Sequence, residues 1–247
     1  IKSKQFSDFI IKNRPGVSSN LQNTFDECWP LHPVVSSLLG PISRRRFGQN
    51  QRSIFGFLNS SEPLGFQDFL KEANENDLYE GHNLFDYLKL NLEPSILSSP
   101  DGHRWSLSVD SIERCSSLEE AEPIHLELLK TISIIDLFKE RSGLLPAKSL
   151  LPYLLSKHTK RDILSALDFL EKKSLLIYRK FNNAYAIYAG SDFDIEKSIE
   201  EYSSEFQSID FNVLKNLAKL SPILAKRYYH ETGTQRWFEF DIVPFSD

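Results

Sequence analysis

Apolar residues recur at helical spacing along most of this chain, and they predict a mainly α-helical protein. Two segments show the pattern most clearly, Asn83–Leu92 and Pro123–Arg141. The first has apolar residues on one face, which is typical of an amphipathic helix. The second is apolar around most of its circumference, so we expect it to be buried. Ser142-Gly143 ends it as glycine commonly ends a helix.

The sequence predicts the order of helices and strands most clearly between residues 146 and 188. Pro146–Leu155 predicts a short helix, and Thr159 is placed to cap a second helix, Lys160–Lys173. Two strands flank the turn Asn182-Asn183. With the long helix before them, these elements give three helices followed by a β-hairpin, an order that resembles a winged helix. The strands are expected at Ser174–Tyr178 and Ala184–Tyr188, and the buried side of the second helix at Ile163, Leu164, Leu167 and Leu170.

Proline and glycine mark the expected breaks between elements. Gly40-Pro41 breaks or kinks a helix that begins at Pro33, and Pro94–Gly102 is expected to be a loop or linker. We therefore expect a helical, lid-like domain at 1–115, a winged-helix domain at 116–190 and a trailing segment at 191–247. The trailing segment is expected to contain an acidic helix (Asp192–Phe206), a helix broken near Pro222 (Phe211–Tyr229) and a half-buried strand (Trp237–Val243).

The composition and net charge argue against several classes of function. The 247 residues carry a formal net charge of −5, so broad attraction to nucleic acid is not expected. Cys28 and Cys115 are the only cysteines, which suits a reducing cytosol, and no apolar run approaches the length of a membrane span. We therefore expect a cytoplasmic protein without a membrane partner. The chain begins with Ile1 and contains no methionine, so we also expect it to be a portion of a longer protein.

Several kinds of chemistry lack their sequence signals. There is no glycine-rich loop followed by Lys-Ser or Lys-Thr, and hence no phosphate-binding P-loop within the chain. The histidines show no paired spacing with cysteines or carboxylates, so no metal site is expected. The run Ile132–Asp136 faintly resembles a magnesium-binding strand, but it continues as a helix and is interpreted as core. We expect no catalysis from the isolated chain.

The densest positive charge lies in Arg44–Arg52, directly before the apolar run 54–58. A helix start with arginines around it is a natural phosphate site. A solvated basic corner is the equally simple interpretation.

The predicted winged helix raises the question of DNA binding. Arg161 and Lys172 lie on the expected exposed face of the helix 160–173, but Asp168 and Glu171 share that face and would repel phosphates. The hairpin offers Arg179 and Lys180. Duplex DNA is therefore an alternative ligand that is not favoured over packing within the chain or against a partner. The set of candidate contacts for nucleic acid or a partner is Arg44, Arg45, Arg161, Lys172, Arg179 and Lys180.

Gly48, Arg52 and the apolar run 54–58 resemble the sensor-2 region of AAA+ ATPases, although the spacing is one residue longer than in the commonest form. A helical lid followed by a winged helix also resembles initiator-type AAA+ and STAND-type ATPases. The runs 46–53 and 231–236 resemble large bacterial ATP-binding proteins, including those of phage-defence systems.

The resemblance implies a non-catalytic regulatory portion of a bacterial ATPase, with a winged-helix nucleic-acid-binding module as the alternative. Arg52 would sense the terminal phosphate of ATP, supported by Arg46, Gln49 and Asn50, which would alternatively contact a neighbouring subunit of a homo-oligomer. ATP, with Mg²⁺, would be bound mainly by the P-loop core of the same protein, outside this chain.

Overall fold

The computed structural model describes residues 2–14, 16–17, 20–45, 54–140, 142–188 and 210–243. These residues are mainly helical, with a few small antiparallel strand pairs, which confirms the prediction from periodicity. The chain divides into two compact units, Ile1–Gly190 and Ser191–Asp247, which we describe separately. The predicted boundary between residues 115 and 116 falls inside the first unit and stays a prediction. The expected acidic helix at 192–206 lies outside the described residues.

In its described residues, the first unit consists of helices followed by a hairpin. α3 runs through Gly40-Pro41, where a break or kink was predicted. The described elements are α1 (Lys2–Asn13), α2 (Leu21–Glu27), α3 (Pro33–Arg44), α4 (Ile54–Asn59), α5 (Phe66–Glu72), α6 (Gly81–Leu97), α7 (Gly102–Ser116), α8 (Pro123–Phe138), the 3-10 turn η1 (Leu151–Tyr153), α9 (Lys160–Lys172), β1 (Leu176–Arg179) and β2 (Ala184–Ile187).

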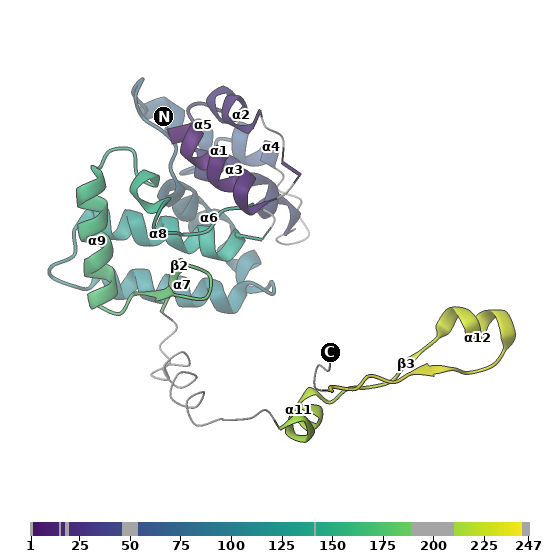
Figure 1. The fold of residues 1–247 in the computed structure, drawn as a ribbon. Coiled ribbons are helices and arrows are strands. Elements are labelled where there is room, and N and C mark those ends of the chain that lie inside the picture. The colour runs from purple at the N-terminus through teal and green to yellow at the C-terminus, as the bar shows by residue number, and fades with distance from the viewer. Residues whose placement is uncertain are drawn as a thin grey trace. The chain divides into compact units, whose positions relative to one another are not determined.

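α8 is the central helix of this unit. Pro123 occupies its first turn, and Glu122 and His125 cap it reciprocally, so the long apolar run begins as a helix at a defined point. Its side chains are buried on nearly every side, as predicted from their distribution. α8 packs against α3, α6 and α7 and also against α9 and β2, and Figure 1 shows it crossing the middle of the unit.

α6 and α7 form the layer that supports α8. Phe85 of α6 stacks on the fully buried Trp105 of α7 with ring centroids 4.9 Å apart, and the Trp105 indole N–H donates to Glu93. The predicted loop at 94–102 was wrong in its first part, because α6 continues through Pro94 to Leu97. Ile96 is fully buried there, and its packing outweighs the hydrogen bond that proline cannot donate.

The hairpin closes the first unit and confirms the predicted turn. Arg179 pairs with Ala184 in antiparallel register, and Asn183 adopts a left-handed conformation (φ 51°) that asparagine tolerates. An antiparallel bridge from Ala147 to Ala184 adds a third segment to the hairpin. The predicted helix at 146–155 is reduced to η1, since its first residues are extended to make this bridge.

One position on α9 was assigned to the wrong face. Leu164 is 47% exposed, whereas Ile163, Leu167 and Leu170 are buried as expected. Residues 163, 167 and 170 recur at three- and four-residue spacing on one face, and residue 164 lies about 100° around the helix from residue 163.

The second unit is small and buries none of its described side chains. The predicted helix at 211–229 is interrupted: α11 (Phe211–Ala218) ends at Lys219, and β3 (Ile223–Leu224) follows before α12 (Lys226–Thr232). β3 pairs antiparallel with β4 (Trp237–Phe238). The strand expected at 237–243 is therefore shorter than predicted and is exposed.

Candidate functional site

The residues predicted to sense a nucleotide, Arg46, Gln49, Asn50 and Arg52, lie outside the described residues. Their role stays a prediction. The candidate sites of the described chain are the remaining basic residues and the side chains that surround them.

Arg44 and Arg45, at the end of α3, differ in exposure and in their contacts. Arg44 is exposed. Arg45 forms ion pairs with the buried Asp101 (3.3 Å) and with Glu140 (3.0 Å). Arg45 therefore connects the end of α3 to the start of α7 and to the segment after α8, and its guanidinium is occupied by carboxylates of its own chain.

The exposed face of α9 is nearly neutral, as the sequence predicted. Arg161 and Lys172 are exposed, and so are Asp162 and Asp168, whereas Glu171, also expected on this face, is half-buried and accepts a hydrogen bond from the hydroxyl of Tyr185. Thr159 caps the helix by accepting a hydrogen bond from the backbone N–H of Asp162. A helix with this mixture of charges gives DNA phosphates little net attraction.

The tip of the hairpin exposes a cation next to an aromatic ring. Lys180 is exposed beside Phe181, whose side chain is 75% exposed. Arg179, one residue earlier in β1, is half-buried and faces the body of the unit. The structure thus separates the two hairpin cations that the sequence had grouped together.

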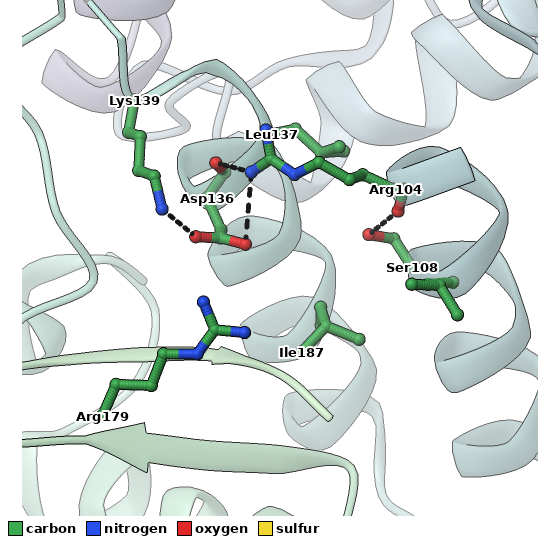
Figure 2. Close-up of a pocket in the computed structure, with 8 residues that line it drawn as sticks. Arg104, Ser108, Asp136, Leu137, Lys139, Arg179 and Ile187 are labelled. Carbon is green, nitrogen blue, oxygen red and sulfur yellow. Dashed lines mark hydrogen bonds and ion pairs between the residues drawn. The ribbon is translucent and has the colours of Figure 1, made fainter. Parts of the chain in front are cut away.

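Arg179 lines a pocket of about 250 Å³. Figure 2 shows its guanidinium extending from the hairpin toward the carboxylate of Asp136, near the end of α8. Arg104 of α7 and Lys139, directly after α8, reach the same space. The other lining residues are Leu107, Ser108, Leu137 and Ile187.

Asp136 organises two of the three cations in this pocket. Its carboxylate lies 2.8 Å from the Lys139 ammonium and 3.4 Å from the Arg104 guanidinium. Arg104 also donates to the backbone carbonyl of Asp136. With three cations and one carboxylate, the charged groups of the pocket sum to +2. The arrangement is chemically suited to an anion.

A second polar site joins α6 to the loop that leads into α9. The carboxylate of Glu80, which is nearly fully buried, accepts hydrogen bonds from the backbone N–H groups of Ser156 (2.6 Å) and Asn83. On the same loop, His158 lies 2.9 Å from Glu127 of α8. These contacts attach the start of α9 to both α6 and α8.

His82 lies next to Glu80, with 3.6 Å between its Nδ1 and the carboxylate. Burial lowers the pKa of His82, and the negative charge of Glu80 opposes this effect. Its Nδ1 is buried without a hydrogen-bond partner within the described part of the chain. The neutral form of His82 is therefore favoured in the fold.

Sequence reasoning missed Arg104, Asp136, Lys139 and Glu80. Asp136 had been interpreted as part of a core helix, which is correct, but its carboxylate leaves the core at the last turn of α8. Asp136 and Lys139 are only three positions apart in the chain, but tertiary packing alone brings Arg104 and Arg179 to them and Ser156 to Glu80, and local spacing does not show those approaches.

No protein-family model, curated protein or solved structure matches this chain. Across the described ranges, no cluster of three or more histidine, cysteine, aspartate or glutamate side chains is arranged to hold a metal ion. In the same part of the chain, no helix has the combination of length and apolar character that a bilayer crossing requires.

Proposed function

We propose that residues 1–190 are a non-catalytic coupling module of a larger nucleotide-responsive protein. In this proposal a helical bundle and a winged-helix arrangement at 123–188 share one helix, α8. The supporting observation is the packing of α8, which contacts α6 and α7 of the bundle and also α9 and β2 of the segment that follows it. A movement of the bundle would be transmitted to the hairpin, because a close-packed interior does not deform gradually.

The nucleotide contact in this proposal is Arg52, which follows the described helix α3 in the chain. Arginine stabilises the charge that develops on a transferred phosphoryl group. The P-loop and Mg²⁺ ligands would come from the core of the same protein. A role in phage defence rests on the sequence resemblance alone.

The test uses the protein encoded by the complete gene. Its coding sequence should contain a P-loop and a strand ending in Asp-Glu within about two hundred residues before Ile1, the size of one domain. Arg52→Ala should lower its ATP turnover at least about tenfold, with an unchanged far-UV circular dichroism spectrum. Arg44→Ala, eight positions earlier, is the matched control and should retain turnover. Absence of the P-loop, or equal turnover in both variants, would contradict the proposal.

A nucleic-acid-binding module is the second candidate. The observation that favours it is the hairpin tip, where Lys180 and Phe181 combine a cation with an exposed ring that can stack on a base. It requires duplex or single-stranded DNA to bind the 247-residue chain with an affinity that falls as salt rises. A flat fluorescence-anisotropy titration at low salt would remove this candidate.

A further inference from the structure

We propose that the pocket between α7, the end of α8 and the hairpin binds a phosphate group. Its donors come from three separate elements: Arg104 from α7, Lys139 from the residue after α8, and Arg179 from β1. A phosphate carries oxygens in several directions and can accept from all three. The proposal does not rest on the coupling role, because these residues form a site in the described chain by themselves.

Arg179 is the residue that most clearly lacks a partner. Its side chain is half-buried, yet it forms no hydrogen bond or ion pair with any other residue that the structure describes. A partly desolvated guanidinium is costly unless an acceptor satisfies it. In Figure 2 it points toward Asp136, and no hydrogen bond or ion pair joins the two side chains, so an acceptor could enter the pocket between them.

Asp136 prepares the site without neutralising it. Its two carboxylate oxygens are occupied by Lys139 and Arg104, which fixes the positions of both cations. Each cation keeps further N–H donors, since a guanidinium has about five and an ammonium about three. Arg104 and Lys139 also remain 37% and 28% exposed at their side chains, so a ligand from solvent can reach them.

The volume of the pocket limits the size of the ligand that it can hold. At about 250 Å³ the pocket is smaller than most sites for drug-sized molecules, and it suits a phosphoryl group with little else attached. The source of that group is either free inorganic phosphate or the end of a small phosphate ester. Either one would bridge β1 to α7 and to the end of α8, and would thereby restrain the hairpin.

The experiment is isothermal titration calorimetry of the 247-residue chain with inorganic phosphate and, separately, with ribose 5-phosphate. Sodium chloride keeps the ionic strength constant, because screening alone changes surface electrostatics. Arg179→Ala is the informative variant, since Arg179 has no described partner whose loss would disturb the fold. It should weaken binding at least about tenfold, the effect of losing a charge-assisted hydrogen bond. Lys180→Ala, the adjacent hairpin cation outside the pocket, should bind as the original chain does.

Comparing the affinities of the two ligands distinguishes free inorganic phosphate from a phosphate ester as the natural ligand. Tighter binding of inorganic phosphate supports the free anion, and tighter binding of ribose 5-phosphate supports an ester. Absence of binding by both at millimolar concentration would overturn the proposal. Equal weakening in Arg179→Ala and Lys180→Ala would also overturn it, because that result describes diffuse attraction to a basic hairpin.

Discussion

Replacing Glu80 by alanine tests the polar junction between α6 and the loop before α9. The buried carboxylate accepts from the backbone N–H groups of Ser156 and Asn83, so the variant leaves two half-buried donors without their acceptor. A hydrogen bond to a charged group contributes about 1.5–3 kcal/mol, so losing both should cost about 3–6 kcal/mol. This is a large part of the about 5–15 kcal/mol that stabilises a typical domain. It corresponds to a fall in Tm of about 10 °C for a unit of this size.

The assay is urea unfolding followed by tryptophan fluorescence and by circular dichroism at 222 nm. Trp105 is fully buried on α7 and reports directly on the α6–α7 layer. Amide hydrogen exchange then locates the damage: exchange should accelerate in Ser156 and α9 before it accelerates in α8. Glu113→Ala is the matched control, because that carboxylate is exposed and its ion pair with Lys89 lies at the surface. A loss below about 1 kcal/mol in Glu80→Ala would refute the reasoning.

Two further predictions concern a close approach and a titrating cap. Gly102→Ala should destabilise the fold by about 3 kcal/mol in urea unfolding, because a Cβ there overlaps the backbone of Leu97 and no rotamer change relieves it. Gly56→Ala, with open space around its Cα, should be neutral or stabilising by up to about 1 kcal/mol, and equal losses in both variants would contradict this. Burial lowers the pKa of His125, whose Nδ1 accepts from the backbone N–H of Glu122 and caps α8, so the folded state favours the neutral ring. Stability should therefore be complete above about pH 6.5, the ordinary histidine value, and decline as the pH falls below it. His125→Gln keeps an acceptor and should reduce this decline between pH 7.5 and 5.5, whereas an unchanged slope would show that the cap is not responsible.

The spacing of apolar residues, together with capping and turn residues, predicted several elements correctly. α8 was predicted because its apolar residues cover most of the circumference, and in the structure Pro123 occupies its first turn. α9 and the hairpin were predicted because Thr159 and the Asn182-Asn183 turn mark their boundaries chemically. Where such a signal is strong, tertiary packing agrees with it and the element is identified correctly.

The errors occurred where packing overrides a local signal. The segment from Pro94 was predicted to be a loop, but α6 continues through Pro94 because Ile96 is buried in the core. A helix was predicted at Pro146–Leu155, but Ala147 instead forms an antiparallel bridge with Ala184. In each case the deciding contact is with a residue distant in the chain, which one-dimensional spacing does not record.

The candidate site was less predictable than the fold for the same reason. Arg104, Asp136 and Arg179 are each separated by more than thirty positions, and their sequence neighbours are those of ordinary surface residues. Arg179 could be named from sequence as a hairpin cation, but its direction could not. Alternation along the strand would not have supplied it, because Ile177 shares a face with Arg179 and is 40% exposed.

The orientation of Arg179 also bears on how the hairpin would be used. A hairpin that binds duplex DNA projects its cations toward the phosphates outside the molecule. Here Lys180 projects outward, while Arg179 turns inward toward Asp136 and the end of α8. The nearly neutral exposed face of α9 offers no compensating attraction. Because the guanidinium of the hairpin is directed at the end of α8, the direction of Arg179 favours the proposed coupling role over the proposed nucleic-acid-binding role.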